Sequence, residues 1–437
     1  MSKLISQAVA IGGLFTALAV GVCSAETITA FAGTGESGFA GDGGPARFAQ
    51  LNAPGSLAVD GAGGLYIMDT DNFRIRRVFA DGTITTVAGT GDVSSPVEGP
   101  ANQSPFIALN DIALSPNGQL HIADTDGLQK VDQAGILRYL ISDQSAPNVA
   151  ISNQGTVYIG DRTTVSRLEI DGSLTLLAGT DEGDSGDSGP AAWAQFWVTA
   201  LATDRMGNIY VLDTYANRLR KFSPGGNIST VAGVGVADFF GDNGPANQAA
   251  LNSPSSIAVD VAGNIYISDS GNQRIRKVST DGTISTFAGQ TDSSDEGDDG
   301  PAVNAYFAYP GNIAVGCSAL YVVDGDRVRS IGLTSPLIAQ NGVTSITSSL
   351  NSVRGGELFS ISGCNLARTT VKAEPGFSLP ITLGGVRVTV GGMVVTLLSV
   401  SPTQIVAQLP AGVPPGTNTL SVSVSGNGSA TGSINVN

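Results

Sequence analysis

The sequence predicts an all-β protein, a six-bladed β-propeller followed by an Ig-like β-sandwich. A four-strand pattern recurs six times over residues 28–334, and short alternating strands of a different spacing follow it. One copy contains IAVD (257–260), IYISD (265–269), RIRKV (274–278) and ISTFAG (284–289), separated by Gly, Asn and Asp turns. Short β-branched runs between such turns indicate hairpin-connected strands. Four strands in each repeat are typical of propeller blades.

The second strand of each repeat fixes the register of the others. Successive copies of its final residue are 55, 37, 52, 56 and 55 residues apart. The short step belongs to the third copy, which lacks an insertion that precedes the other five first strands. The final residue is an aspartate in all six copies: Asp69, Asp124, Asp161, Asp213, Asp269 and Asp324.

The first and last repeats indicate how the ring closes. The sixth copy has no clear fourth strand after Ile331, whereas the fourth-strand sequence ITAFAG (28–33) precedes the first copy. An open ring would leave unpaired strand edges. We therefore expect residues 28–33 to be the outer strand of the sixth blade, and residues 26–334 to form the propeller.

The motif IAVD-x4-IYI-x-D-x2-N-x-RIRKV resembles the NHL-repeat propeller family, best at 257–278 and 57–78. The insertion GDGGPA (41–46) and its relatives GDNGPA (241–246), GDSGPA (186–191) and DDGPA (298–302) are similar to those of exported bacterial members. The second, third and sixth copies lack the Asn-x-Arg element. The resemblance implies the fold, whereas propellers of this kind serve unrelated functions.

Residues 1–25 have the features of a signal peptide. Lys3 precedes an apolar run from Ala8 to Val22, and small residues occupy the two positions that a signal peptidase recognises before Glu26. We expect an exported protein, in the periplasm, at the cell surface or outside the cell. Cleavage would leave Cys317 and Cys364. Export permits them to join, but the sequence favours two separate buried thiols.

Charge excludes one class of partner. The net charge is −15, and residues before 336 carry −17 because the C-terminal part is slightly basic. An acidic propeller repels phosphate, which argues against nucleic acid. No run in the mature chain is long and apolar enough to span a membrane.

After the last repeat, residues 335–343 are expected to be a linker and residues 344–437 an Ig-like sandwich. Alternating runs occur at 357–363, 386–392, 394–400, 404–410, 419–426 and 432–437. The segments at 355–367, 383–392 and 400–410 resemble a C-terminal module of exported acidobacterial proteins, itself similar to IPT/TIG folds.

Catalytic chemistry has little support in the sequence. His121 is the sole histidine, so neither a zinc site with several histidines nor a histidine-dependent lactonase can be built. It aligns with Tyr66, Tyr266 and Tyr321 of other repeats, which favours a packing role. No G-x-S-x-G elbow with a partner histidine occurs. We therefore favour a non-enzymatic role, with no catalytic or metal-binding residue and no cofactor assigned.

The acidic residues have two interpretations. Strand direction places the insertions and the turns after the repeated aspartates on one face. The structural interpretation is that each repeated aspartate caps its turn and pairs with an arginine, as Asp69 would with Arg74, Asp213 with Arg218 and Asp269 with Arg274. The functional interpretation is a ligand or Ca²⁺ surface. Ligand contacts are expected near solvated loop charges that add little stability: Asp42, Asp187, Asp242 and Asp298.

The sequence thus favours an exported binding or scaffold protein with a protein or glycan ligand. The ligand would lie on the acidic face that carries the insertions, with the repeated aspartates as further contacts. One alternative is a Ca²⁺-dependent propeller hydrolase of the lactonase type. A structural element of the cell surface or matrix is the other.

Overall fold

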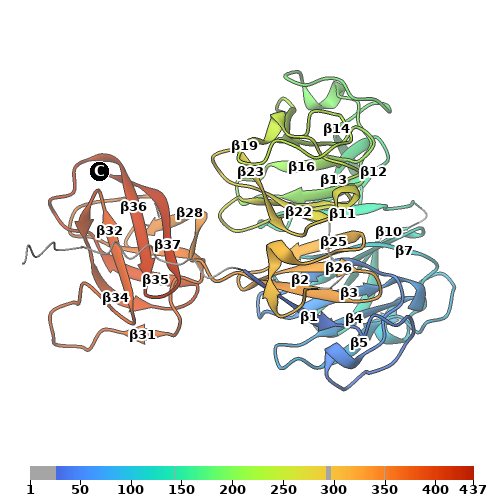
Figure 1. Cartoon of the computed structure of the whole chain (residues 1–437), viewed down its shortest axis with the longest axis horizontal. Helices are drawn as coiled ribbons and strands as arrows, with labels where there is room; N and C mark the ends of the chain where they lie inside the picture. Colours follow the sequence, from blue (N-terminus) through green and yellow to red (C-terminus); the bar gives the residue numbers. More distant parts are fainter. Residues whose placement is uncertain (1–25, 143, 292–296, 349) are drawn as a thin grey trace, which may run out of the picture.

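The computed structural model describes residues 26–142, 144–291, 297–348 and 350–437. Within these ranges the chain is built from strands, and its helices are single 3-10 turns. A C-terminal body of two sheets lies beside a larger body of six sheets (Figure 1). None of the described helices has the length and apolar character needed to cross a membrane.

The larger body has six sheets, which we call blades 1 to 6. Blades 1 to 5 each contain the four consecutive strands of one repeat, and in blade 6 the N-terminal strand takes the fourth place. Blade 1 contains β2 (Pro54–Val59), β3 (Leu65–Asp69), β4 (Arg74–Val78) and β5 (Ile84–Ala88). Blade 2 contains β7 (Leu109–Leu114), β8 (Leu120–Asp124), β9 (Gly127–Val131) and β10 (Ile136–Ser142). Blade 3 contains β11 (Asn148–Ile151), β12 (Val157–Asp161), β13 (Thr164–Leu168) and β14 (Leu174–Ala178).

The remaining three sheets follow the same order. Blade 4 contains β15 (Ala200–Thr203), β16 (Ile209–Asp213), β17 (Arg218–Phe222) and β18 (Ser229–Ala232). Blade 5 contains β20 (Ser256–Val259), β21 (Ile265–Asp269), β22 (Arg274–Val278) and β23 (Thr283–Ala288). Blade 6 contains β25 (Pro310–Val315), β26 (Ala319–Asp324), β27 (Val328–Gly332) and β1 (Thr27–Ala32).

The first strands of the six sheets contact one another in a closed cycle, β2–β7–β11–β15–β20–β25 and back to β2. One hydrophobic cluster fills the space between each pair of neighbouring sheets. The alternation of apolar residues along each strand explains this, because both faces of a blade meet a neighbour.

Strand β1 joins the two ends of this cycle. It lies antiparallel beside β27, with Ile28 opposite Ile331 and Ala30 opposite Arg329. The Thr29 and Ser330 hydroxyls are 3.0 Å apart, and Ile28 is fully buried. The N-terminal strand therefore occupies the outer position in the last sheet.

Each of five insertions runs along the outer edge of the blade that it precedes. The short strands β6 (Gly99–Pro100), β19 (Gly244–Pro245) and β24 (Gly300–Pro301) pair antiparallel with β10, β23 and β1. Single bridges, Pro45–Thr83 and Pro190–Asn227, take their place in blades 1 and 4. A 3-10 turn follows in each insertion: η1 (Ala46–Phe48), η3 (Ala101–Gln103), η4 (Ala191–Trp193), η5 (Ala246–Gln248) and η7 (Ala302–Asn304). Two further 3-10 turns, η2 (Thr70–Asn72) and η6 (Ser270–Asn272), connect second and third strands.

The C-terminal body is a sandwich of two five-stranded sheets around one apolar cluster. One sheet contains, in spatial order, β28 (Leu337–Ser345), β30 (Leu358–Cys364), β35 (Gln404–Gln408), β34 (Thr396–Val400) and β31 (Val371–Lys372). The other contains β29 (Ser352–Val353), β37 (Gly428–Val436), β36 (Gly416–Val424), β32 (Val386–Val390) and β33 (Met393–Val394). The expected linker at 335–343 is wrong for most of its length, because β28 begins at Leu337 and pairs with β30.

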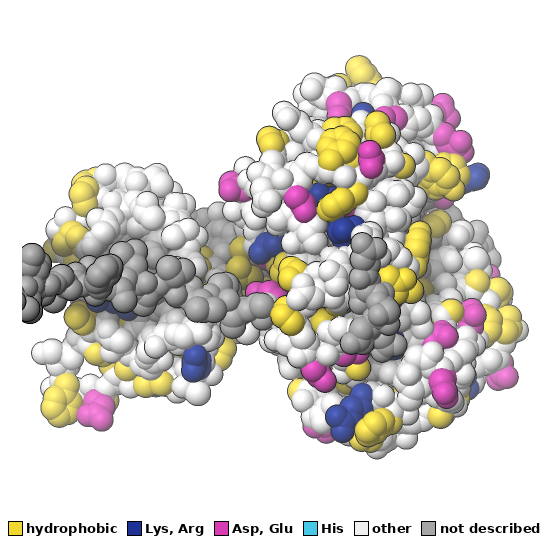
Figure 2. All heavy atoms as spheres, in the orientation of Figure 1, with side chains coloured by type: hydrophobic (Ala, Val, Ile, Leu, Met, Phe, Trp, Pro, Cys, Tyr) yellow, Lys and Arg dark blue, Asp and Glu magenta, His cyan; other side chains and the backbone are white. Residues whose placement is uncertain are grey.

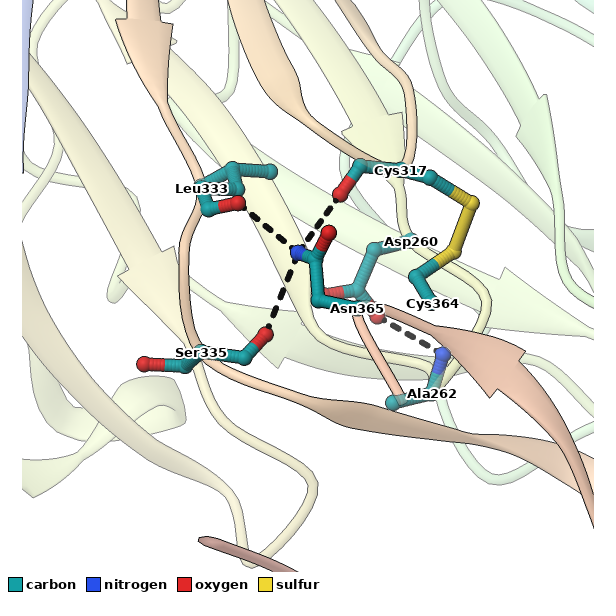
Figure 3. Close-up of a disulfide and its surroundings, with 7 residues drawn as sticks. All are labelled: Asp260, Ala262, Cys317, Leu333, Ser335, Cys364 and Asn365. Atoms are coloured by element: carbon teal, nitrogen blue, oxygen red, sulfur yellow. Dashed lines mark hydrogen bonds between the residues drawn. A yellow bond between two sulfur atoms is a disulfide. The ribbon is translucent and has the colours of Figure 1, made fainter. Parts of the chain in front are cut away.

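The two bodies are joined by more than the chain. Cys317, in the turn between β25 and β26, forms a disulfide with Cys364 at the end of β30 (Figure 3). The Asn365 amide donates to the carbonyls of Cys317 at 2.9 Å and Leu333 at 2.7 Å. The Gln340 N–H donates to the Val261 carbonyl at 2.8 Å. The expectation of two separate thiols is therefore wrong.

Candidate functional site

The insertions and the loops between second and third strands lie together on one face, which we call the insertion face. In blade 1 the Asn72 amide donates to the Gly38 carbonyl at 2.8 Å, and the Asn52 N–H donates to Asp69 Oδ1 at 2.8 Å. Blade 5 repeats the second contact between Asn252 and Asp269 at 2.7 Å. In blades 1 and 5 the repeated aspartate therefore holds the insertion against its blade.

The four insertion aspartates pair with buried arginines in the third strands. Arg276, fully buried, donates to Asp242 Oδ1 at 2.7 Å, and the Thr286 hydroxyl donates to Asp242 Oδ2 at 2.6 Å. In blade 4, burial opposes ionisation of Asp187, but hydrogen bonds from Thr230 and Arg220 outweigh it and lower its pKa. The matching ion pairs are Asp42–Arg76, Asp187–Arg220, Asp242–Arg276 and Asp298–Arg329.

The repeated aspartates share those arginines. Arg76 donates to Asp69 at 3.2 Å and Arg276 to Asp269 at 3.1 Å, and both aspartates are fully buried. Burial raises the pKa of each carboxyl despite the arginine. The expected pairs with Arg74, Arg218 and Arg274 are wrong. Asp69 and Asp269 pair with the arginine two residues further along the strand, and Asp213 is bonded by backbone N–H groups. Arg218, for example, pairs with Asp184.

The partners of the other repeated aspartates depend on which residues their own blades offer. Asp324 pairs with Arg329 at 3.2 Å, and Asp213 accepts hydrogen bonds from backbone N–H groups. Asp124, fully buried, accepts a hydrogen bond from the Gln129 amide at 3.0 Å, because glutamine replaces the arginine in blade 2. Asp161 is exposed at the end of β12, where no insertion covers it.

Most of the aspartates that the sequence predicted as ligand contacts therefore bind other groups of the protein and stabilise the insertion face. The expectation that the insertion aspartates are free solvated charges is wrong, since each pairs with an arginine that is at most 1% exposed. Their small effect on stability stays a prediction from the sequence. Figure 2 shows acidic side chains dispersed over the larger body, with few on the C-terminal body. Ligand binding on this face would therefore depend on side chains that take no part in these ion pairs.

Such side chains surround a cavity of about 690 Å³ at the centre of the insertion face, which we call the channel mouth. The residue before the first core residue of each inner strand lines it, and five of these six residues are polar. They are Ser56, Asp111, Asn148, Ala200, Ser256 and Asn312. Since each comes from a different blade, the polar groups converge on the cavity from around the ring.

Asp111 is the one carboxylate among these six residues. Its Oδ2 accepts the Val149 N–H of the next blade at 2.9 Å, and its Oδ1 accepts the Ile112 N–H at 2.9 Å. The side chain is partly exposed to the cavity, yet the surrounding protein raises the pKa of this carboxyl to about 6 by desolvation. Asp111 thus changes charge near neutral pH.

An aromatic pair borders the same cavity. The rings of Trp197 and Tyr215 have centroids 4.9 Å apart with an interplanar angle of 59°, and the Arg162 guanidinium lies 4.7 Å from the Trp197 ring centroid. The Tyr215 side chain is 76% exposed. Asp213 accepts the N–H groups of Trp197 at 3.1 Å and Ala216 at 2.9 Å, so this repeated aspartate positions both aromatic segments.

Sequence reasoning missed this site, although the repeats contain a signal for it. Trp197 occupies the place of Asn52 and Asn252, and Tyr215 occupies the place of Asp71 and Gly271. Comparison of the repeats column by column isolates blade 4, where two polar or small loop residues have become aromatic. The aspartate that recurs in all six repeats indicates the fold. The two aromatic residues that occur at these positions in blade 4 indicate the site.

A larger cavity of about 1220 Å³ lies on the opposite face, around the turns between first and second strands. Its carboxylates Asp204 and Asp260 accept N–H groups of their own turns, and Asp60 pairs with Arg77. His121, 4% exposed as expected for a core residue, has its pKa lowered to about 4 by desolvation.

Two family models match the chain. Residues 144–295 match the teneurin NHL domain, and residues 343–437 match the IPT/TIG domain. Mouse teneurin-4 is 29% identical over 250 residues, which is 54% of this chain and 8% of that protein. The Arabidopsis thaliana protein SUPPRESSOR OF QUENCHING 1 is 25% identical over 283 residues, which is 56% of this chain and 26% of that protein. The matched region is thus a small part of both relatives.

Solved structures share the propeller fold. A Bacteroides thetaiotaomicron protein of unknown function aligns with a TM-score of 0.57 at 20% identity, over 70% of this chain and 76% of its own. A protein from Bacteroides ovatus described as an auxiliary nutrient binding protein aligns with a TM-score of 0.54 at 17% identity, with the same coverage of both chains. At these identities the likeness concerns the fold.

Proposed function

Since this chain is an NHL-repeat propeller protein with a C-terminal IPT/TIG domain, we propose that it is an exported, non-catalytic binding protein that holds a glycan at the channel mouth. One observation carries the proposal, namely the Trp197–Tyr215 pair beside a ring of converging polar side chains. Aromatic rings pack against the C–H faces of sugars, while planar amides and carboxylates bond their hydroxyls. A cavity of about 690 Å³ has the size of a small-ligand site.

Two further observations are compatible with this proposal. Two Bacteroides proteins of the same fold are described as auxiliary nutrient-binding proteins. The Cys317–Cys364 disulfide suits an oxidising compartment, in agreement with export. The expected signal peptide at 1–25 lies outside the described residues.

We infer in addition that the six blades, closed by β1, and the sandwich are separate domains that divide near residue 335.

The alternative function to be distinguished from glycan binding is that of a calcium-dependent hydrolase. In the part of the chain that the structure describes, no three His, Cys, Asp or Glu side chains group together to hold a metal ion. Asp111, together with the amides of Asn148 and Asn312 that line the same cavity, is the oxygen-rich place that Ca²⁺ would take. A calcium-dependent rate with a lactone panel would favour the hydrolase over the binding protein.

The glycan proposal is tested by titration of the purified protein with neutral and amino-sugar oligosaccharides, followed by tryptophan fluorescence. The chain has two tryptophans, so Trp193→Phe isolates the signal of Trp197. We expect Tyr215→Ala and Trp197→Ala each to weaken binding at least tenfold, which corresponds to about 1.4 kcal/mol. Because Trp197→Ala removes the fluorescent side chain, its affinity is measured by calorimetry. Trp193, 74% exposed, is the matched control. Equal affinity of wild type and both variants, or no binding by any oligosaccharide, would refute the site.

A further inference from the structure

The outer edge of blade 3 differs from the other five edges. Elsewhere the insertion pairs with the outward backbone groups of the fourth strand, as when the Ile84 N–H donates to the Gly44 carbonyl at 3.0 Å. By the register of the sheets, Leu174 of β14 is the counterpart of Ile84. No described residue pairs with the outward backbone groups of Leu174 or Leu176. Strand β14 is therefore a bare sheet edge.

The side chains of this edge have changed together with the missing insertion. In blade 1, Arg76 lies opposite Thr86, and both bond Asp42 of the insertion. In blade 3 the same register pairs Ser166 with Leu176. Blade 2, which keeps an insertion, also keeps a polar contact, because the Tyr139 N–H donates to Glu98 at 3.1 Å. The edge of blade 3 is thus apolar where covered edges are polar.

The packing beside this edge is thin. The cluster between blades 2 and 3 contains five fully buried residues, whereas each of the other five junctions contains at least eleven in the described ranges. Leu140, Leu168 and Leu174 are half-buried there. Leu176 is 53% exposed, and Ile170 in the preceding turn is fully exposed. An apolar edge without charge or cover is what strand addition requires.

We propose that β14 is a strand-addition site for an extended segment of another protein, with an apolar centre and basic residues on both sides. The segment would run antiparallel to β14, as β6, β19 and β24 run beside their own fourth strands. Its backbone would bond the outward groups of Leu174 and Leu176. Its apolar side chains would cover Leu176 and Ile170. This site is independent of the channel mouth.

Charge selects this partner over a second copy of the chain. Exposed carboxylates stand at both ends of the edge, Asp171 before β14 and Asp181 and Glu182 after it. An antiparallel pair of two β14 strands centred on Leu176 would place Asp171 of one copy opposite Asp181 of the other, at both ends. Like charges directly opposite one another destabilise a strand pair. Lysines or arginines of a partner segment opposite these carboxylates would stabilise the strand pair.

The test uses the purified protein and two synthetic peptides, each with alternating Thr and Val in the centre. One carries two lysines at each end and the other two glutamates. We expect the lysine peptide to bind at least tenfold more tightly by fluorescence anisotropy, less so at high salt, and to slow hydrogen exchange at residues 174–177. Leu176→Lys should weaken it at least tenfold. The control Ser229→Lys, at an exposed position on the covered edge of blade 4, should leave binding unchanged.

Charge exchange gives a second measurement that does not depend on Leu176. In the double variant Asp181→Lys with Glu182→Lys, preference should shift toward the glutamate peptide. Absence of binding by either peptide, or protection on another strand, would overturn the proposal. A concentration-dependent dimer that Leu176→Lys dissolves would overturn it in favour of self-association.

Discussion

At the scale of single residues, the buried arginines are the most consequential side chains of the propeller. Arg276 donates hydrogen bonds to Asp242, Asp269 and the Ala250 carbonyl while it is fully excluded from water. A buried guanidinium without its carboxylates costs several kcal/mol. The partly exposed Asp242 shares this task with Asp269, so its loss should cost less than that.

We therefore expect Asp242→Ala to lower the free energy of unfolding by roughly 1–3 kcal/mol. The change leaves Arg276 with one carboxylate instead of two. Thermal melting and urea denaturation measure it. Asp92→Ala, at an exposed carboxylate, is the control and should melt like the wild type. Equal melting of both variants would mean that the Asp242–Arg276 pair contributes nothing to stability.

Asp111 gives a pH-dependent prediction. Its pKa is raised to about 6 in the folded protein, against about 3.9 in an unfolded chain. The folded state therefore holds the proton more tightly, so the contribution of Asp111 to stability falls as the pH rises from about 4 to about 6. Asp111→Asn should lack this contribution, and the difference in unfolding free energy between the proteins should change across that window. A constant difference from pH 4 to pH 8 would contradict the raised pKa.

The residues also show what sequence alone could supply. The repeats located the strands correctly because each apolar column meets a neighbouring blade. They led to Arg74 as the partner of Asp69 instead of Arg76. Both arginines lie on the same face of β4, and only the insertion, 34 residues away, buries the second. Trp197 and Tyr215 belong to different loops, and the disulfide depends on how two domains sit. Such contacts are set by tertiary structure, which periodicity does not encode.

At the scale of elements, β1 is the strand whose removal should have the widest effect. Deletion of residues 26–33 exposes β27 along its whole length and removes the buried Ile28 and Ala32. Since each blade packs on two neighbours, we expect a large loss of melting temperature for the propeller. Thermal melting of this deletion beside a deletion of residues 336–437 measures it. The second should leave the propeller transition nearly in place, and equal losses would contradict the closing role of β1.

At the scale of the whole molecule, the disulfide and the hydrogen bonds of Asn365 hold the two bodies together. The bridge closes a loop of 47 residues, for which chain entropy gives a stabilisation of roughly 4 kcal/mol. Cys317→Ser with Cys364→Ser should leave the core of each domain intact but speed proteolysis between residues 332 and 343. Limited proteolysis with mass spectrometry measures the site and rate. Cleavage as slow as in the wild type would show that Asn365 and Gln340 suffice to hold the domains.

The position of β1 also has a consequence for the order of events when the protein is made. Thr29 and its partner Ser330 are 301 residues apart, which at about 5–20 residues per second amounts to roughly 15–60 s of synthesis. Strand β1 can therefore take its place only after β27, near the far end of the propeller, has been made. Until then its apolar edge is open to other chains. We therefore expect the chain to be more prone to association with other chains before the ring closes than after it.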